Sequence, residues 1–474
     1  MFFLLRNSLN LFISQRIHIW CDRFKTQEVK FLRVRHVWWY SLRMAKVKRH
    51  LRPGTVLVIG FITIILFGSL LLSLPWAKKG TGVTYLDCLF VSVSSVCVTG
   101  LTTVDIANTF TIFGRVVIAV LIQIGGLGFA SFALFIITLL GRKVSFSSIS
   151  LAKEAMNFDS GKGVIGMVYS ILRYAFCIEI IGTILLAIPY YKMTGNFLQA
   201  LGMGAFHSLS AFNNAGFDLN GDFSSLSCFH GNVYVNIVVA LLILVGGLGF
   251  IVIKDVIHQR KWSRFSFHTK IVLFMTLILV SLGTLLLMLG GTAPLDAFFH
   301  AVSARTAGFS TIAMEDMSNS SSLVMIFLMF IGANPGSTGG GVKTTTVFVI
   351  FLAMASVVSG RKPDAFKRRI PQDSITKALT VFVMAIIVIL LATYSIMLIE
   401  GDRFSTLDIL FEVVSAAATV GLSRSLTPML QIGSKLLIMA VMFLGRLGPL
   451  TIVTMFTKTR QAHLEHIEEN VLIG

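Results

Sequence analysis

The sequence predicts an all-α membrane protein built from four repeats, each made of a membrane span, a shorter apolar run and a second span. Three observations support this fold class. The 474-residue chain is 55% hydrophobic and only 13% charged, with a mean hydropathy of +0.82, whereas a soluble domain carries roughly 25% charged residues. Several apolar runs reach the ~20 residues that a helix needs to cross a bilayer. A short motif also recurs four times, which indicates internal duplication.

The recurring motif begins with Phe, continues through small, Ser and Thr residues, and ends in a glycine followed by a large apolar residue. Its copies FVSVSSVCVTGL, FHSLSAFNNAGF, FFHAVSARTAGF and FEVVSAAATVGL end at Gly100–Leu101, Gly216–Phe217, Gly308–Phe309 and Gly421–Leu422. A lone copy would be read as a loop turn. Four copies, each placed after an apolar half-span and before a full span, favour a shared structural role.

The repeats divide the chain into a basic N-terminal segment and four units. We expect the segment at 1–50 and the units at 51–141, 142–258, 259–360 and 361–474, the last with a C-terminal tail. The expected spans lie at about 55–74, 112–140, 164–190, 233–253, 271–289, 323–358, 378–399 and 436–456. Eight full crossings would place both termini on one side.

Glycine-rich sequences mark the second spans. GGLGF occurs at 125–129 and again at 246–250, and GRLGP occurs at 445–449. GGLGF lacks the GxGxxG spacing of a nucleotide loop and follows no strand, so we interpret it as a site of close helix packing through small residues. The span 323–358 is interrupted by GANPGSTGGGVK at 332–343, where Pro335 removes a backbone donor and forces a break.

The formal charge of +18 raises three interpretations: nucleic-acid binding, an anion pathway, or membrane topology. Position favours topology, because the basic residues cluster in short loops between spans, as the positive-inside rule describes. Contact with anionic membrane lipids is compatible with the same clusters. The loops that hold the repeated motif then face outward, and their acidic residues would concentrate cations there. These acidic residues are Asp105, Asp218, Asp222, Glu315, Asp316, Glu400 and Asp402.

The half-spans are too short to cross and read as re-entrant segments. Asp87, Asp296 and Asp408 stand near the start of three of them, where a carboxylate can cap the first backbone N–H groups. The negative end of each half-helix would point at the membrane centre. A dehydrated alkali cation needs oxygen ligands, which rings of backbone carbonyls supply. Glycine allows the required dihedrals, so one glycine from each repeat would give one ring of four.

These motifs together resemble the Trk/Ktr/HKT family of potassium transporters, most closely the membrane subunits of its Ktr branch. The resemblance runs from about Arg52 to the last residue and rests on the doubled GGLGF, FNNAGF, RTAGF, STGGGVKTTT and GRLGPLT. It implies four pore-loop repeats, with eight full transmembrane helices and four re-entrant half-helices, around one pseudo-fourfold pore. Family members that admit sodium have serine at the first filter glycine, so Gly100 indicates the potassium-selective type.

The resemblance also assigns site residues. The potassium filter would be lined by Val98, Thr99, Gly100, Asn214, Ala215, Gly216, Thr306, Ala307, Gly308, Thr419, Val420 and Gly421. The polar loop residues would be intolerable facing lipid, so the loop would lie inside the pore below the filter and gate it. The gate would comprise Gly332, Pro335, Gly336, Ser337, Thr338, Gly339, Gly340, Gly341 and Lys343, together with Arg446 from the fourth repeat.

Partners follow from the same resemblance. It implies a homodimer in the cytoplasmic (inner) membrane, with both termini cytoplasmic, seated on a ring of nucleotide-binding regulatory subunits of the RCK type. The chain itself would hold no cofactor, K⁺ would be its substrate, and Na⁺ could act as an activator. Neither a metal site nor a disulfide framework is expected from the five cysteines, whose spacing is unpaired. No nucleic-acid partner is expected.

Several residues keep more than one interpretation. Arg446 is either a controller of cation passage or a structural arginine, and Arg305 is expected to brace the filter from behind. Glu179 fits an interhelical hydrogen bond, Glu412 is ambiguous, and His207 and His300 fit packing or hydrogen-bonding roles or a pH role. The alternative function is a secondary transporter of another ion, with a midplane site at the broken helix where Lys343 would meet an anion. An enzyme is not predicted, because HExxH, GxSxG and paired intramembrane aspartates are missing from the sequence.

Overall fold

The computed structural model describes residues 53–80, 82–128, 131, 132, 134, 138 and 164–448. The predicted N-terminal segment, the loop at 142–162 and the C-terminal tail lie outside these residues. The described chain is helical, apart from one short hairpin in which β1 (Asp364–Ala365) pairs with β2 (Arg368–Arg369).

Four helices are long and apolar enough to cross a membrane, and they coincide with the predicted first spans. They are α3 (Pro53–Ser73), α9 (Val164–Thr194), α13 (Phe267–Leu289) and α17 (Gln372–Glu400). Each is followed by a shorter helix that covers the predicted half-span. These are α4 (Tyr85–Cys97), α10 (Phe197–Phe212), α14 (Pro294–Ser303) and α18 (Thr406–Ala417).

The predicted second spans are not single continuous helices: the break at 332–343 was predicted, and the breaks at the glycine-rich pentapeptides were not. They comprise α6 (Ile112–Leu127), α11 (Val233–Leu248) with α12 (Phe250–Gln259), α15 (Asn319–Phe330) with α16 (Thr344–Ser359), and α19 (Ile432–Leu447). The chain bends by 99° between α11 and α12, and this pair counts as a fifth candidate span if it is taken as one. Short helices occupy the connections: α5 (Ile106–Thr109), η1 (Pro75–Ala77), η2 (Ser227–Phe229), η3 (Trp262–Arg264), η4 (Met314–Asp316), η5 (Gly401–Arg403) and η6 (Thr427–Met429).

The prediction of continuous second spans was wrong at the glycine-rich pentapeptides. Helices α6, α11 and α19 all end at the leucine of the motif, and the chain turns at the glycine that follows it: Gly128, Gly249 and Gly448. These glycines have φ of 83°, 94° and 80°, which side chains with a Cβ rarely adopt. The first glycine serves close packing, as predicted, because a Cβ on Gly125, Gly246 or Gly445 would strike the carbonyl oxygen of Val96, Phe212 or Ala417.

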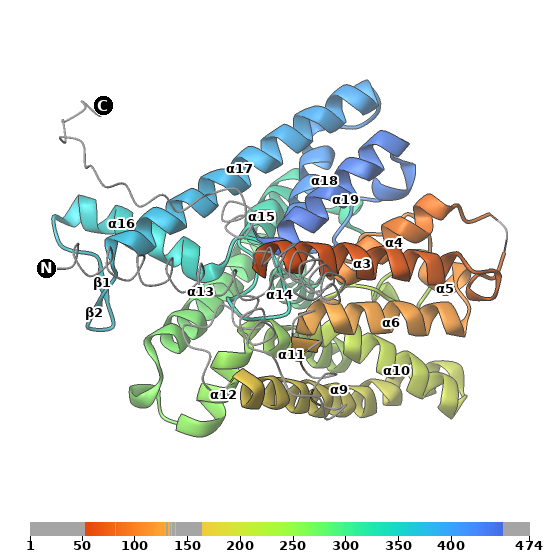
Figure 1. The fold of residues 1–474 in the computed structure, drawn as a ribbon, viewed down its shortest axis with the longest axis horizontal. Coiled ribbons are helices and arrows are strands. Elements are labelled where there is room, and N and C mark those ends of the chain that lie inside the picture. Colours follow the sequence, from red (N-terminus) through yellow and green to blue (C-terminus); the bar gives the residue numbers. More distant parts are fainter. Residues whose placement is uncertain are drawn as a thin grey trace, which may run out of the picture. The chain divides into compact units, whose positions relative to one another are not determined.

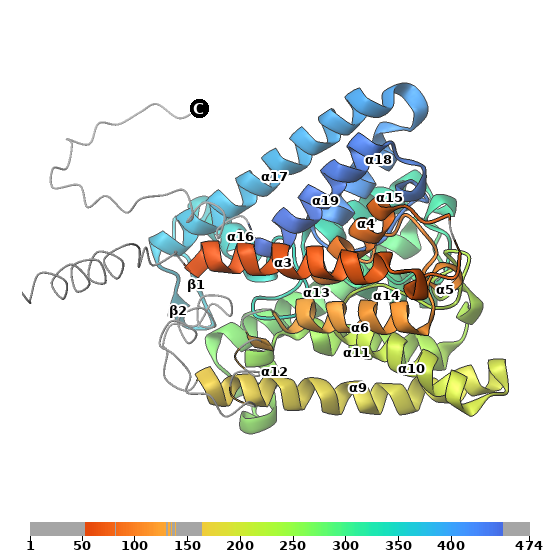
Figure 2. The same cartoon turned by 45° about the vertical axis from the view of Figure 1, so that its right-hand side comes forward.

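The helices pack as four groups, and the fourth group contacts the first. Each half-helix contacts the long helix that precedes it, and the following helix contacts the next half-helix: α6 against α10, α11 against α14, α15 against α18, and α19 against α4. Helix α3 runs between the α17–α19 group and the helices α6, α9 and α10 (Figure 1; Figure 2). This arrangement brings the ends of all four half-helices together.

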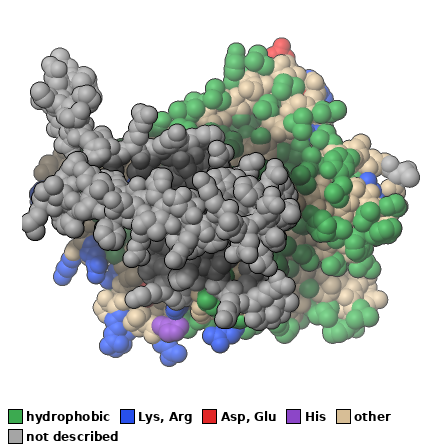
Figure 3. Space-filling model, in the orientation of Figure 1, with side chains coloured by type: hydrophobic (Ala, Val, Ile, Leu, Met, Phe, Trp, Pro, Cys, Tyr) green, Lys and Arg blue, Asp and Glu red, His purple; other side chains and the backbone are tan. Residues whose placement is uncertain are grey.

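Charge gathers at one end of the described protein. Figure 3 shows Lys and Arg side chains beside the end of α12, while hydrophobic side chains cover much of the remaining visible surface. The basic loop that includes Arg260 and Lys261 adjoins the β1–β2 hairpin, since the rings of Trp262 and Phe366 lie 6.3 Å apart. Two of the predicted basic clusters therefore lie at the same end.

Candidate functional site

The four motif segments share one backbone conformation after their half-helices. The residue two positions before the glycine is left-handed in every copy: Val98 (φ 57°), Asn214 (58°), Thr306 (76°) and Thr419 (53°). The glycines also have positive φ, at 98° for Gly100, 69° for Gly216, 80° for Gly308 and 97° for Gly421. Because non-glycine residues seldom adopt φ above zero, its recurrence at the same position in four copies shows a specific local fold.

The four glycines lie in contact around a ring. A Cβ on Gly100 would lie 2.5 Å from the carbonyl oxygen of Ala215, and one on Gly216 would lie 2.7 Å from that of Ala307. The corresponding atoms on Gly308 and Gly421 would strike the carbonyl oxygens of Val420 and Thr99. The last contact returns to the first segment, so each glycine is required by its neighbour as well as by its own dihedrals.

The backbone donors of these segments point back into the half-helices. The N–H groups of Thr99, Ala215 and Val420 donate to the carbonyl oxygens of Ser94, Ser210 and Ser415, each at 2.8 Å. The hydroxyls of Ser94 and Ser415 also accept from the N–H groups of Gly100 and Gly421 at 3.0 Å. Within the described part of the chain, no carbonyl of the predicted filter residues accepts a hydrogen bond. A ring of buried acceptors without donors can coordinate cations.

The loop 332–343 lies directly against this ring. A Cβ on Gly339 would strike the side chain of Thr306, and one on Gly340 would strike that of Thr419. The N–H of Gly340 donates to Thr419 Oγ1 at 3.0 Å. On the other side, Asn334 Nδ2 donates to the carbonyl oxygen of Gly247 at 2.7 Å. The loop therefore packs between the ends of the third and fourth segments and the end of α11.

Two basic side chains donate to carbonyls of the loop, Arg446 from α19 and Lys343 from the loop itself. Arg446 donates to the carbonyl oxygens of Thr338, in the loop, and Gly125, at the end of α6. It stands at the second position of GRLGP, where both GGLGF copies have glycine. Lys343 Nζ donates to the carbonyl oxygen of Gly339 at 2.7 Å and to that of Gly340 at 3.4 Å. Lys343 thus folds back onto its own loop, which was not anticipated from the sequence.

The second segment is fixed from behind by a buried polar network. Asn213 Nδ2 donates to Gln123 Oε1 at 2.8 Å and to Glu179 Oε1 at 3.0 Å, and Gln123 Nε2 donates to Glu179 Oε2 at 3.2 Å. These residues come from α6, α9 and the end of α10. The predicted role of Glu179 in an interhelical hydrogen bond is confirmed.

Three segments are held by side-chain contacts between the half-helix and the chain that follows the segment's glycine, which we call the return chain. Asp87 accepts from Thr103 Oγ1 at 2.7 Å, Asp296 accepts from Thr311 Oγ1 at 2.6 Å, and Asp408 lies 2.7 Å from Arg424 Nε. Each partner is the third residue after the segment's glycine. The expectation that all three aspartates cap N–H groups was wrong: only Asp87 does so, at Thr84 N. In the fourth segment the capping acceptor is Ser405 Oγ, to which the N–H of Asp408 donates.

The two histidines brace the return chain in the same way. His207 Nε2 accepts from the N–H of Leu219 at 3.3 Å, and His300 Nε2 accepts from that of Thr311 at 3.4 Å. Glu412 occupies the same position in the fourth segment and bonds to Ser423 at 3.0 Å. The predicted hydrogen-bonding role of these histidines is confirmed. Their shared place directly after a Phe of the motif was the sequence signal for this bracing.

Not every predicted site residue lies where we expected. Glu400, the last residue of α17, is buried and pairs with Arg403. It also accepts from the N–H of Gln431, so it holds the start of α19 and does not face an open acidic mouth. Asp105 and Asp222 do lie together, since Asn108 Nδ2 donates to both at 2.6 Å and 3.1 Å. Arg305 is buried, and its Nε has no hydrogen-bond partner among the described residues.

The fold and this site define a membrane transport protein. The family model of the TrkH cation transport proteins matches residues 23–290 and 269–467. The chain belongs to this family. The match begins at residue 23, earlier than the resemblance near Arg52 suggested. Its relatives named below are ion transporters, so the prediction that the chain is not an enzyme is confirmed.

Two curated relatives span nearly the whole chain. The Ktr system potassium uptake protein B of Bacillus subtilis is 38% identical over 453 residues, covering 92% of this chain and 100% of the relative. The potassium/sodium uptake protein NtpJ of Enterococcus hirae is 36% identical over 457 residues, with the same coverage. The crystal structure of the potassium transporter TrkH from Vibrio parahaemolyticus superposes with a TM-score of 0.63 at 19% identity, covering 84% of this chain and 85% of that one. This structural likeness supports the fold.

Proposed function

We propose that this protein takes up K⁺ across the cytoplasmic membrane through one pathway lined by carbonyls of the four motif segments. The supporting observation is the closed ring in which each glycine abuts the carbonyl of the next segment. In the proposed architecture, the four groups of helices are four pore-loop repeats around one pseudo-fourfold axis. The names of the two bacterial relatives, a potassium uptake protein and a potassium/sodium uptake protein, agree with this substrate.

The proposed filter works by replacing the ion's hydration shell. Its carbonyl oxygens have no donor within the described chain, so they are free to face a dehydrated cation. The segments' N–H groups are satisfied by the half-helices, which fixes the direction of the carbonyls. Uptake would follow the membrane potential, because a cation moving inward gains about 2.3 kcal/mol per 100 mV.

Ion flux in proteoliposomes tests this function. Purified protein in vesicles with an imposed potential should carry K⁺ and discriminate against Na⁺ and Cl⁻. Flux of an anion, or no K⁺ flux from protein shown to be folded, would contradict the proposal. An anion pathway is the alternative function. It finds little support in the loop, because Lys343 already donates to the carbonyls of Gly339 and Gly340.

The loop 332–343 is the proposed gate. It packs against Thr306 and Thr419 beneath the ring, and Arg446 ties Thr338 to Gly125. Deleting Ser337–Gly340 should raise K⁺ flux and weaken control by a cytoplasmic partner, while K⁺ selectivity is kept. The control is Ser337→Ala, which keeps the loop's length and removes only the 2.6 Å bond to the Asn334 carbonyl. Wild-type flux from a folded deletion variant would leave the loop as a static break.

The proposed assembly is a homodimer in the cytoplasmic membrane that binds a ring of nucleotide-binding regulatory subunits, with Na⁺ as an activator. The common end of the basic loops supports the orientation. Cysteines placed at the exposed residues Ser374 and Ser320 test it in a background in which Cys21 and the two native cysteines that are exposed in the described chain, Cys177 and Cys228, are replaced. The first should label from the cytoplasm and the second from outside, and the reverse pattern would contradict the direction of uptake.

A further inference from the structure

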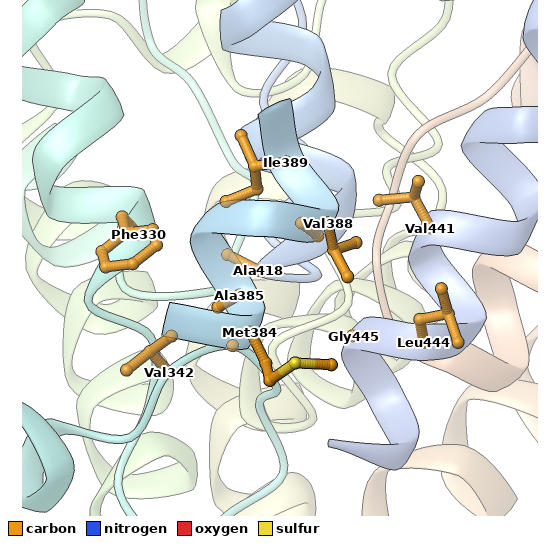
Figure 4. A pocket seen from close by; sticks show the side chains of 12 residues that line it. Phe330, Val342, Met384, Ala385, Val388, Ile389, Ala418, Val441, Leu444 and Gly445 are labelled. Carbon is orange, nitrogen blue, oxygen red and sulfur yellow. The ribbon is translucent and has the colours of Figure 1, made fainter. Parts of the chain in front are cut away.

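An apolar cavity lies behind the fourth segment and beside the proposed gate. Its volume is about 150 Å³, and it is bounded by the loop, α15, α17, α18 and α19 (Figure 4). Every lining residue is glycine or apolar. The lining residues are Phe330, Gly341, Val342, Met384, Ala385, Val388, Ile389, Ala417, Ala418, Val441, Leu444 and Gly445. We call this space the α17–α19 cavity.

Alignment of the four segments shows why space remains at this position. The two residues before the left-handed position are Val96–Cys97, Phe212–Asn213, Ala304–Arg305 and Ala417–Ala418. The fourth pair is the smallest. In the second segment, the Asn213 side chain at the position of Ala418 reaches Gln123 and Glu179. Ala418 cannot reach the spans behind it, so the corresponding volume is left open.

The cavity reaches from the protein interior to the lipid-facing surface. Val342, Ile389, Ala418 and Val441 on its inner side are buried. On its outer side, Met384, Ala385, Val388 and Leu444 are only partly buried. The surrounding surface of α17 is strongly apolar, with Val383, Ile387, Leu390 and Leu391 exposed. The mouth of the cavity is therefore continuous with a surface that faces hydrocarbon.

The lining selects a hydrocarbon occupant. An apolar cavity of this size stays dry and binds small hydrocarbons, since water finds no polar partners in it. An ion or a lipid headgroup would likewise find no hydrogen-bonding side chain. In a bilayer the acyl chains next to α17 are the abundant hydrocarbon, and burying each methylene against protein gains contact energy.

We propose that the α17–α19 cavity binds an acyl chain of a membrane lipid, which packs against Gly341 and Val342 and holds the loop under the filter. The effect on transport rests on the proposed function, whereas the binding does not. The bound acyl chain would contact both the fourth segment and the loop, because Ala417 and Ala418 lead into the fourth segment and Gly341 belongs to the loop. Lipids of different acyl-chain length or unsaturation should then change K⁺ flux.

Photolabelling of the full-length protein tests the binding. The probe is a phosphatidylcholine with a diazirine in its acyl chain, mixed into proteoliposomes, and labelled peptides are mapped by mass spectrometry. We expect label on Val342 or Leu444 in the wild-type protein. Ala385→Leu should reduce that label about tenfold, the effect of losing room for a few methylene groups. The matched control Ala440→Leu makes the same change at an exposed position of the neighbouring helix α19 and should retain the label.

The outcomes separate binding from transport. Label restricted to outward residues such as Leu391, equal label in Ala385→Leu, or a crosslink to a second copy of the chain at these positions would each overturn the lipid site. In parallel, K⁺ flux of the wild-type protein should vary with acyl-chain composition, while that of Ala385→Leu should not. Label in the cavity without any K⁺ flux would contradict the proposed function and leave the lipid site standing.

Discussion

The second and fourth segments have the same backbone conformation but differ in what packs behind them. Asn214 and Thr419 are both left-handed, and Gly216 and Gly421 both have positive φ. Behind the second segment, Asn213 is bonded to Gln123 and Glu179. Behind the fourth lies the α17–α19 cavity. A hydrogen-bonded network resists displacement, whereas a region with few contacts opens at lower cost.

The difference indicates that the second and fourth segments have different roles in the ring. Asn213 bonds the second segment to α6 and α9, so its carbonyls can stay fixed while other parts of the protein move. The fourth segment instead contacts the loop, because the N–H of Gly340 donates to Thr419 Oγ1, and the loop in turn accepts from Arg446 at Thr338. In the proposed function, selectivity needs the fixed segment and gating needs the one with fewer contacts behind it. We therefore expect substitutions on the two sides to have different consequences.

Glu179→Ala should have the largest effect. It leaves Gln123 Nε2 without its acceptor in a buried site and removes side-chain volume, at a cost of about 3 kcal/mol in the free energy of unfolding. Thermal unfolding of the purified protein measures the loss, and K⁺ over Na⁺ selectivity should fall with it. Glu179→Gln is the control, since it retains an acceptor for Gln123. Equal stability of the Ala variant and the wild type would show that the network is not a support.

Arg446→Ala should act on the loop 332–343, next to the fourth segment. Loss of the bonds to Thr338 and Gly125 removes about 2 kcal/mol of charge-assisted hydrogen bonding from the closed position. Such a change shifts a two-state equilibrium by roughly thirtyfold at most, so K⁺ flux should rise while selectivity is kept. Vesicle flux assays measure both. A fall in selectivity without a rise in flux would place Arg446 in the filter's support instead of the gate.

Exchanging residues between segments should have a smaller effect. Ala418→Cys introduces the residue that the first segment has at this position, Cys97, and partly fills the cavity. We expect a gain of about 0.5–1 kcal/mol in stability and reduced K⁺ flux. The reciprocal Cys97→Ala should cost about 1 kcal/mol. If Ala418→Cys destabilised the protein, the cavity would be smaller in solution than it is here.

The smallest effect concerns the outer loop of the second segment. Burial, with a contribution from nearby Asp105, raises the pKa of Asp218 to about 7. Asp218 is then neutral below that pH and negative above it, and an outer negative charge attracts cations. K⁺ uptake should rise about twofold between pH 6 and 8, and Asp218→Asn should abolish the change. The same raised pKa predicts that stability declines as pH rises from about 4 to about 7. An unaltered pH profile in the Asn variant would assign the titration elsewhere.

The sequence predicted the parts of this molecule that repeat. The four glycines, the half-helices and the broken helix at 332–343 followed from recurrence and from helix-breaking residues. The exact ends of the second spans did not, because GGLG and GRLG combine close packing with a turn at their last glycine, and only the packing was foreseen. Hydropathy alone extends such helices too far.

Contacts between distant residues could not be predicted in the same way. Gln123, Glu179 and Asn213 are polar residues in separate apolar segments, and nothing local indicates that their amides and carboxylate meet. Lys343 likewise looked like a free charge until its own loop carbonyls were seen to accept from it. The small pair Ala417–Ala418, by contrast, was visible in the aligned copies and marks the cavity once the copies are known to share a backbone.

The most direct test of a single ring is the K⁺ over Na⁺ flux ratio of Gly100→Ser, Gly216→Ser, Gly308→Ser and Gly421→Ser in proteoliposomes. In each variant the new side chain would strike the carbonyl of the next segment and disfavour the positive φ. All four folded variants should lose discrimination, whichever support lies behind the segment. A folded variant with the wild-type ratio would remove its segment from the filter and contradict the ring.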